Sequence, residues 1–400
     1  MRVRTCGLAI VAALALVTSP SLAQRVEAPD DSGAPQPSAA PPPSYNEDAV
    51  QVPVDIRVHG GRTYRGPMVV TTFRPDGPGP FPLVVVLHGR SSESRHDPAR
   101  YRPTRLAGYW VRRGFAVIIP TRVGYGALGV SPDLEDPGPC SDPDYRAMAE
   151  ALVATTEAVA RWARTQPWAE PSRLIVTGIS VGGFGAVMAS GRPPEGLTAI
   201  VNLAGGSGGR PTRRPGVPCA TDRIADFVGR AGRTARVPSI WIYAENDLFW
   251  GAAAPRRWHA AYTSAGGTAE LVMLPPVGDD GHRFPAEAFS RWRREVDRFI
   301  DRLGFQIPRS RDVPAPTGFA EVDDAERVPV INAKVKADGY QKFLAADIPR
   351  AFAIGPDGAW AWSGGNFDAV ARSLERCKVH AKTDCKLYAV DDAVVWQPSG

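Results

Sequence analysis

Short apolar segments alternate with longer amphipathic segments over residues 51–305. Two of the amphipathic stretches, 144–165 and 287–303, repeat apolar residues at intervals of three and four. Apolar strands that alternate with amphipathic helices are typical of a mostly parallel sheet with helices on both faces, whose active site lies at the carboxyl ends of the strands. We predict this α/β architecture. The apolar, strand-like segments lie at 68–70, 81–87, 115–119, 174–176, 200–203, 240–243 and 271–274.

Two proline-containing stretches flank this catalytic region, which we place at 48–305. Residues 24–47 hold six prolines and few large apolar residues, so they predict a disordered tether, and residues 306–316 predict a linker. The pattern then shortens and predicts a small α+β domain over 317–400. Its predicted elements are strands at 352–354 and 359–362, a helix at 368–380, and a hairpin of 387–390 with 394–396.

The first 23 residues have the organisation of a signal peptide. Arg2 and Arg4 precede an apolar run from Cys6 to Val17, and Ser21-Leu22-Ala23 ends the segment with small residues. The run of about 12 apolar residues is shorter than the roughly 20 that cross a bilayer. We therefore predict cleavage after Ala23, no stable membrane anchor, and export to the periplasm or the outside.

Composition agrees with a large folded protein. The 400 residues are 44% hydrophobic and 22% charged, which excludes collagen-like, wholly disordered and polytopic membrane proteins. The net charge of +5 is small and no compact basic run accompanies it, so we expect no nucleic-acid partner.

Four cysteines remain after the predicted cleavage, an even number in a compartment that permits disulfides. Three pairings are possible. We expect Cys140–Cys219 and Cys377–Cys385, because this pairing respects the predicted domain boundary, with free buried thiols as the alternative. No CxxC and no paired histidine spacing appears, so no metal site is predicted.

The segment GISVGG at 178–183 lies between a predicted strand at 173–177 and a predicted helix at 184–190. Its glycines permit a sharp turn that projects the Ser180 hydroxyl above the sheet, and the helix N-terminus offers N–H groups to a developing anion. Ser180 is therefore the predicted nucleophile.

A serine nucleophile needs a base and an orienting acid, and in this arrangement they follow in the order Ser, Asp, His. Asp247 follows the strand at 239–244, 67 residues after Ser180. Of the six histidines, only His282, in the loop at 278–282, has the right order and context. These residues predict a Ser180–Asp247–His282 triad.

Three other carboxylates compete for the acid role. Glu245 lies close to the end of its strand, while Asp279 and Asp280 adjoin His282 in sequence, which usually prevents an acid from reaching back to the ring. We therefore keep Asp247 as the predicted acid.

An oxyanion hole needs two N–H groups. Val181 supplies one, and Arg90, after the strand at 81–87 and His88-Gly89, is the predicted source of the other. The Arg90 side chain is then free for an ordinary surface role, and His88 is expected to hydrogen-bond its own loop.

Three aromatic residues near these loops are candidate substrate-binding residues. Phe249 and Trp250 follow the predicted acid and are expected to wall an acyl or aryl pocket, with packing beneath the catalytic loop as the alternative. Tyr125, between two glycines, is a further candidate wall or an exposed loop aromatic. The segment 205–237 is expected to fold over the site, with Cys219 securing it.

Taken in order, the strand followed by HGR, then GISVGG, ENDLFW and DDGHRF resemble the dienelactone hydrolase group of the α/β-hydrolase superfamily over residues 46–305. The resemblance implies the α/β-hydrolase fold and an ester hydrolase without a cofactor. Members named for dienelactone cleavage use a cysteine where this chain has Ser180, so serine esterases of the group, acting on aryl, acetyl or polymer esters, look closer. Peptidases similar to oligopeptidases share the fold and triad order.

The C-terminal segments AFAIGPDGAWAW, LERC and CKLYAVDDAVVW resemble a short cysteine-containing module of bacterial exported proteins, for which we expect a stabilising, docking or surface-binding role. The sequence thus predicts an exported serine hydrolase acting on a small-molecule or polymer ester. A serine peptidase of the same fold is the first alternative, and a non-catalytic binding protein is the second.

Overall fold

The computed structural model describes residues 46–90, 94–129, 131–305, 314–346, 348–364 and 369–398. The predicted signal peptide at 1–23, nearly all of the tether at 24–47 and most of the linker at 306–316 lie outside the described residues. Within the described ranges, no helix is long and apolar enough to cross a membrane.

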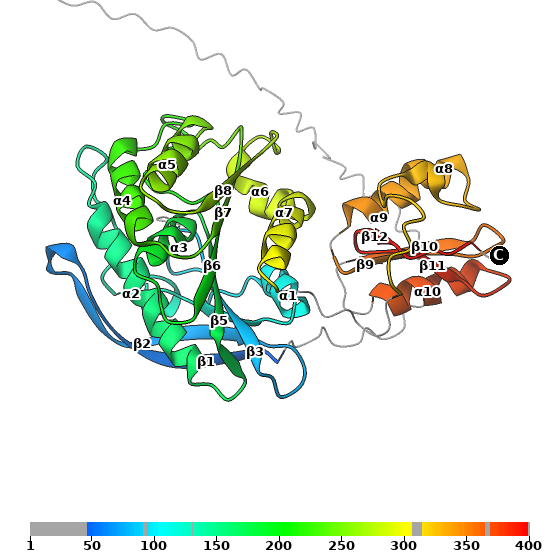
Figure 1. Ribbon diagram of the computed structural model, residues 1–400, viewed down its shortest axis with the longest axis horizontal. Helices are drawn as coiled ribbons and strands as arrows, with labels where there is room; N and C mark the ends of the chain where they lie inside the picture. The colour runs from blue at the N-terminus through cyan, green and yellow to red at the C-terminus, as the bar shows by residue number, and fades with distance from the viewer. Residues whose placement is uncertain are drawn as a thin grey trace, which may run out of the picture. The chain divides into compact units, whose positions relative to one another are not determined.

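An eight-stranded sheet runs through the part of the chain before the linker (Figure 1). Its strand order is β1-β2-β4-β3-β5-β6-β7-β8. Strands β1 and β2 are antiparallel to each other, β2 is antiparallel to β4, and all the other neighbours are parallel. The strands are β1 (Asp48–Arg57), β2 (Thr63–Phe73), β3 (Phe81–Leu87), β4 (Ala116–Pro120), β5 (Ala169–Ile179), β6 (Leu197–Leu203), β7 (Ser239–Ala244) and β8 (Ala269–Leu274).

Helices cover both faces of this sheet (Figure 1). Helices α2 to α5 pack in succession on one face, and α1 and α7 meet on the other, where the Tyr109 ring contacts those of Phe289 and Trp292. The helices are α1 (Thr104–Arg112), α2 (Tyr145–Arg164), α3 (Val181–Gly191), α4 (Thr221–Thr234), α5 (Ala253–Ser264), α6 (Phe284–Glu287) and α7 (Phe289–Arg302), with 3-10 turns η1 (His59–Gly61), η2 (Gly126–Leu128) and η3 (Gly281–Arg283).

The burial of the side chains explains why the apolar pattern predicts some strands and misses others. Side chains 83–87 of β3 are all buried, as a central parallel strand requires, and this continuous run is found at its predicted bounds. The edge strand β1 was not predicted, because Val52, Val54 and Ile56 are separated there by the exposed Pro53 and Asp55 and form no continuous apolar run. The predicted mostly parallel sheet with helices on both faces is confirmed.

After the linker, a separate antiparallel sheet forms a small module with the strand order β10-β9-β11-β12. Its strands are β9 (Arg350–Ile354), β10 (Trp360–Gly364), β11 (Lys386–Val390) and β12 (Ala393–Val394), its helices are α8 (Ala333–Val335), α9 (Gln341–Ala345) and α10 (Ala369–His380), and its further turns are η4 (Ala325–Arg327) and η5 (Lys336–Tyr340). The predicted small α+β domain is therefore present.

The details of this module correct one predicted boundary. Strand β12 ends at Val394, whereas the pattern predicted a strand to Trp396, because the N–H groups of Val395 and Trp396 both donate to the carbonyl of Tyr388 instead of continuing a ladder. The disulfide Cys377–Cys385 links α10 to the residue before β11. Trp360, Trp362 and Trp396 are partly buried and pack against the core of the module.

Candidate active site

The order of the strands brings the predicted catalytic residues to one edge of the sheet. Ser180 directly follows β5, Asp247 follows β7, and His282 follows β8. Arg90 follows β3, the neighbour of β5 on its other side. Because these strands are parallel, their carboxyl ends lie at the same edge, and so do the loops that carry the four residues.

The turn at Ser180 is sharply bent. Ser180 has a φ of 57° and a ψ of −124°, in a region that residues with side chains seldom adopt. A Cβ at Gly178 would lie 2.2 Å from the Gly182 carbonyl oxygen, and one at Gly182 would lie 2.2 Å from that of Leu87. These glycines are therefore needed for the backbone to turn from β5 into α3 against the end of β3.

A chain of hydrogen bonds joins the nucleophile, base and acid. The Oγ of Ser180 lies 3.1 Å from Nε2 of His282, and Nδ1 of His282 lies 2.9 Å from Oδ2 of Asp247. The His282 side chain is 12% exposed and that of Asp247 is fully enclosed. His282 is thus placed to remove the hydroxyl proton while Asp247 orients its ring.

The backbone of its own loop fixes the other oxygen of Asp247. Its Oδ1 accepts hydrogen bonds from the N–H groups of Phe249, at 2.7 Å, and Trp250, at 3.0 Å. These two donors satisfy a carboxylate oxygen that is buried away from water. Oδ2 then remains directed at His282.

Two of the alternative acids, Glu245 and Asp280, have other partners. Glu245 is exposed and pairs with Arg256. Asp280 accepts hydrogen bonds from two backbone N–H groups, those of Leu248 at 3.0 Å and His282 at 2.9 Å. Asp280 therefore links the acid loop to the histidine loop, a role that the sequence reasoning did not assign to it.

The predicted oxyanion donors flank Ser180. Val181 is the first residue of α3, so its N–H has no partner within the helix. The turn before Arg90 lies against the nucleophile, since a Cβ at Gly89 would lie 3.5 Å from Cβ of Ser180. The role of Val181 and Arg90 as oxyanion donors stays a prediction.

Comparisons with known proteins give one family match. A model of the X-Pro dipeptidyl-peptidase (S15 family) matches residues 67–262, which is just under half of the chain. A search of the curated proteins finds no match.

Three solved structures illustrate the range of similar proteins. A putative dienelactone hydrolase from Klebsiella pneumoniae subsp. pneumoniae MGH 78578 is 19% identical, with 62% of this chain and 97% of that chain covered and a TM-score of 0.43. The Pyrococcus furiosus esterase Pf2001 is 14% identical, with 66% and 93% covered and a TM-score of 0.44. The Pyrococcus horikoshii acylaminoacyl peptidase is 13% identical, with 66% of this chain and only 43% of that chain covered and a TM-score of 0.43.

The strand order, the turn at Ser180 and the Ser–His–Asp hydrogen bonds together decide the fold class. The fold is that of an α/β-hydrolase. The site has the geometry of a serine hydrolase, and the names of the similar proteins leave ester and peptide cleavage undistinguished.

Aromatic rings enclose the histidine of the hydrolase. The Phe249 ring stacks on the His282 ring with a centroid distance of 4.1 Å and is partly exposed, and its role as a wall of the substrate pocket stays a prediction. Trp250 meets the same ring edge-on, is 2% exposed, and donates from Nε1 to the Ala204 carbonyl at 2.7 Å. This corrects the prediction for Trp250, because a side chain so enclosed supports His282 from behind instead of lining an open pocket.

Tyr125 also differs from the prediction. It is 5% exposed, its hydroxyl donates to Glu135 at 3.1 Å, and Arg90 donates to the same hydroxyl at 3.0 Å. Tyr125 is thus a buried support of the oxyanion turn and neither a pocket wall nor an exposed aromatic. Sequence reasoning missed its partner Glu135, because the residues around Glu135 carry no pattern that marks a buried carboxylate.

A loop from 205 to 219 packs beside the acid loop. The N–H of Gly206 donates to the Ser180 carbonyl at 3.2 Å, and that of Gly216 donates to the Leu248 carbonyl at 2.7 Å. The disulfide Cys140–Cys219 closes the loop, as predicted. The first part of the segment 205–237 therefore lies at the site, while its later part forms α4, which the sequence reasoning did not predict.

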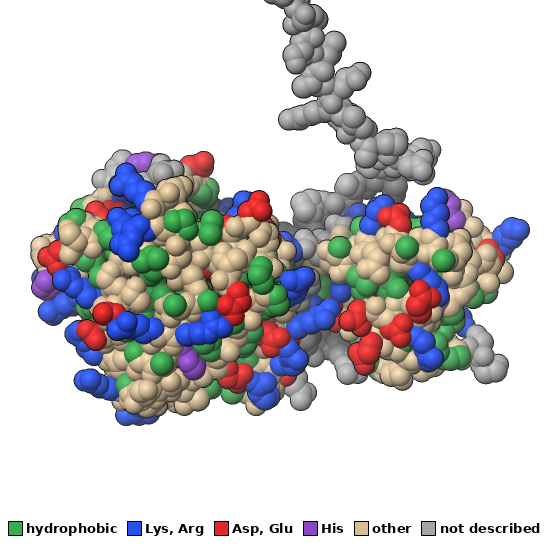
Figure 2. Space-filling view, turned by 90° about the horizontal axis from the view of Figure 1, so that it is seen from above, with side chains coloured by type: hydrophobic (Ala, Val, Ile, Leu, Met, Phe, Trp, Pro, Cys, Tyr) green, Lys and Arg blue, Asp and Glu red, His purple; other side chains and the backbone are tan. Residues whose placement is uncertain are grey.

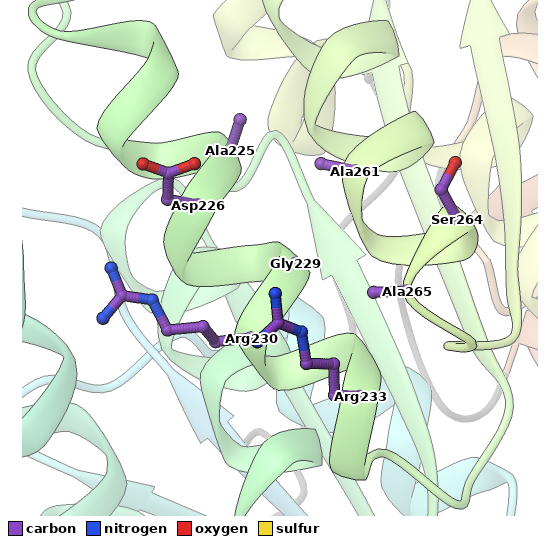
Figure 3. Close-up of a pocket in the computed structure, with 8 residues that line it drawn as sticks. All are labelled: Ala225, Asp226, Gly229, Arg230, Arg233, Ala261, Ser264 and Ala265. Carbon is purple, nitrogen blue, oxygen red and sulfur yellow. The ribbon is translucent and has the colours of Figure 1, made fainter.

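Other surface features lie away from this edge. A concave region between α4 and α5 has basic and acidic side chains of α4 on one side and small residues of α5 on the other, and none of the predicted site residues lines it (Figure 3). Acidic and basic side chains are interspersed on the face in Figure 2. No group of three or more histidine, cysteine or acidic side chains that could hold a metal ion occurs among the described residues.

Proposed function

We propose that the hydrolase cleaves carboxylic esters through an acyl-enzyme intermediate formed on Ser180. The observation that carries this proposal is the hydrogen-bond chain from Ser180 Oγ through the His282 ring to the buried Asp247. A small-molecule or polymer ester is the expected substrate.

In the first half of the reaction, His282 Nε2 takes the Ser180 proton as Oγ forms a bond to the ester carbonyl carbon. The negative charge that develops on the carbonyl oxygen is stabilised by the N–H groups of Val181 and Arg90. The tetrahedral intermediate then breaks the bond to the alcohol oxygen, which receives the proton from His282. Asp247 accepts a hydrogen bond from Nδ1 throughout and stabilises the imidazolium.

In the second half, a water molecule takes the place of the alcohol. His282 removes one of its protons as the water oxygen attacks the acyl carbon, the same N–H groups hold the oxyanion, and Ser180 leaves with the returned proton. The products are a carboxylic acid and free enzyme.

Ester cleavage requires fewer binding groups at this site than peptide cleavage does. An alkoxide is a better leaving group than an amine, so a triad with an oxyanion hole suffices for an ester. A peptidase also needs groups that bind the peptide and orient its amide. The proposal of an ester substrate therefore uses no residue beyond those already described.

We also propose that the hydrolase acts outside the cytoplasm, in the periplasm or the extracellular space. The disulfides Cys140–Cys219 and Cys377–Cys385 support an oxidising compartment. The predicted signal peptide at 1–23 supports the same location.

Peptide cleavage is the second candidate, favoured by the match of residues 67–262 to the X-Pro dipeptidyl-peptidase model. The deciding experiment compares p-nitrophenyl esters from acetate to long acyl chains with Xaa-Pro p-nitroanilides, using mature protein and its Ser180→Ala variant. Ester turnover that disappears in the variant supports the proposal. Anilide cleavage without turnover of esters would replace it with the peptidase, and failure of both substrate classes in folded protein would contradict both.

A further inference from the structure

The peptide between Gly89 and Arg90 has a fixed orientation. Nδ1 of His88 lies 2.7 Å from the Gly89 carbonyl oxygen, so this carbonyl points toward the imidazole ring. The peptide is trans, and the N–H of a trans peptide points opposite to its carbonyl. The Arg90 N–H therefore points away from His88.

The His88 ring is held in the tautomer that this contact requires. The Arg122 N–H donates to Nε2 of His88 at 3.3 Å, so Nε2 is the acceptor and Nδ1 carries the proton. Burial, and then the positive charge of Arg122, hold the pKa of His88 well below its usual value of 6.5. The ring is 3% exposed and packs between Tyr101 and Tyr125.

A buried ion pair lies behind this histidine. The Arg122 guanidinium donates to the His88 carbonyl at 2.7 Å and to both oxygens of Glu135, at 2.5 and 3.0 Å. The side chains of Arg122 and Glu135 are 0% and 2% exposed. Burial, the largest influence, would lower the pKa of Arg122, but the charge and hydrogen bond of Glu135, together with Tyr125 and Tyr101, outweigh it, so the pKa is raised and the arginine remains a cation.

The other end of the oxyanion turn reaches the same carboxylate. Arg90 donates to the Tyr125 hydroxyl at 3.0 Å, and that hydroxyl donates to Glu135 at 3.1 Å. Arg90 is also paired with Asp133 at 2.7 Å. Glu135 thus receives hydrogen bonds from Arg122, which holds His88, and from Tyr125, which holds Arg90.

Buried ion pairs contribute little net stability compared with apolar residues of the same volume, because both charges lose their hydration. Here the pair supplies directed hydrogen bonds to a turn that must keep one N–H aimed at the nucleophile. An error of about 1 Å in such a position can reduce a rate about a hundredfold.

We propose that the Arg122–Glu135 pair is a positioning device for the oxyanion hole, which fixes the turn 88–90 so that the Arg90 N–H faces the substrate carbonyl. This inference rests on the proposed function. Neither residue touches the reacting atoms, and both act through His88 and Tyr125.

The test is Glu135→Gln, which keeps the shape of the side chain but removes its charge and one acceptor. The number of active sites is first titrated with a fluorophosphonate, and kcat and KM for a p-nitrophenyl ester are then expressed per titrated site. We expect kcat to fall about ten- to a hundredfold with KM within about twofold, because the lost interaction acts in the transition state. Binding of a trifluoromethyl ketone, which forms an oxyanion on Ser180, should weaken by a similar factor.

The matched control is Glu157→Gln, because Glu157 forms an arginine–glutamate pair with Arg192 whose side chains are 24% and 63% exposed, far more than those of Glu135 and Arg122. It should leave kcat unchanged. A normal kcat per titrated site in Glu135→Gln, with only a lower unfolding temperature, would overturn the proposal and make the pair purely structural.

If Glu135→Gln does not fold, Tyr125→Phe replaces it, since this change removes one hydroxyl from the enclosed network. A drop in kcat of about three- to tenfold at constant KM supports the positioning role, and no drop contradicts it. If wild-type protein neither reacts with the fluorophosphonate nor cleaves esters, the proposed function itself fails. A defect confined to the variants therefore reports on the positioning device alone.

Discussion

Asp247 is held by backbone N–H groups of its own loop, and the backbone N–H of His282 is held by the neighbouring Asp280, whereas the turn that carries Arg90 is held by charged side chains from another part of the chain. On the acid–base side, the loops 245–251 and 278–283, the carboxylates of Asp247 and Asp280 together accept four backbone N–H bonds. Three of these bonds each lie within one loop, and the fourth, from Leu248 to Asp280, joins the two loops. On the oxyanion side, the turn 88–90 depends on Arg122 and Glu135. The comparison teaches that backbone N–H groups bound to carboxylates hold the acid–base side, whereas a buried network of charged side chains holds the oxyanion side.

The largest effect is expected from a change that removes the residue orienting the base, His282. Asp247→Asn should lower kcat about 10⁴-fold with the fold intact, because the amide favours the wrong tautomer of His282. Steady-state kinetics on a p-nitrophenyl ester measures this. Glu245→Gln, at an exposed acid two residues earlier, should keep wild-type kcat, and equal losses in the two variants would reopen the assignment of the acid.

The next effect concerns the loop that packs on the acid–base side. Replacing Cys140 and Cys219 by serine should lower the free energy of unfolding by about 4 kcal/mol, because the bond closes a loop with a sequence separation of 79 residues. The pair Cys377–Cys385, separated by 8, should contribute about 2 kcal/mol to its module by the same reasoning. Urea unfolding of the two double variants compares them, and a larger loss from the second pair would contradict this order.

Replacing Asp280 should perturb the acid–base side less. Asp280→Ala leaves the N–H groups of Leu248 and His282 without their acceptor, so we expect about 2 kcal/mol of lost stability and about a tenfold lower kcat. Asp280→Asn keeps an oxygen at the shared position and should restore most of the activity. Thermal unfolding and kinetics test this pair, and an equally poor asparagine variant would show that the charge matters more than the hydrogen bonds.

The smallest effect is a pH dependence on the oxyanion side. The folded-state pKa of His88 lies well below 6.5 because of burial and then the charge of Arg122, so only the unfolded chain takes up this proton between about pH 7 and 5. The stability contributed by neutral His88 is therefore present above pH 6.5 and is lost as the pH falls. The loss approaches about 1.4 kcal/mol for each pH unit below 6.5.

Urea unfolding at several pH values measures this slope, and His88→Asn should make it shallower by this single-proton contribution. The exposed His380 of the small module provides the control, since His380→Asn should leave the slope unchanged. An unchanged slope in the His88 variant would show that His88 is not the group responsible.

The difference between the two sides also explains what the sequence could predict. The strands β3 and β5, the helix α2 and the turn at Ser180 follow from local patterns, and so do the positions of Asp247 and His282 after strands. The edge strand β1 and the helices α1, α4 and α5 were missed, because polar residues separate or flank the apolar ones in each of these segments.

The site contains one class of residue that local patterns do not reveal. Glu135 pairs with Arg122 across a loop, and nothing in the neighbouring residues marks a buried carboxylate. Trp250 and Tyr125 were predicted to wall the substrate pocket. The sequence does not show whether a residue near the catalytic loops faces the substrate or packs behind the catalytic residues. Long-range burial decided each of these cases.

The most direct test of the account is the covalent labelling of Ser180. Mature wild-type protein, Ser180→Ala and His282→Ala are treated with a fluorophosphonate and analysed by intact-mass and peptide mass spectrometry. The account predicts one adduct per wild-type chain, on Ser180, no adduct in Ser180→Ala, and labelling slowed by several orders of magnitude in His282→Ala. Folded wild-type protein that remains unlabelled, or that carries its adduct on another residue, would contradict the assignment of a serine hydrolase centred on Ser180.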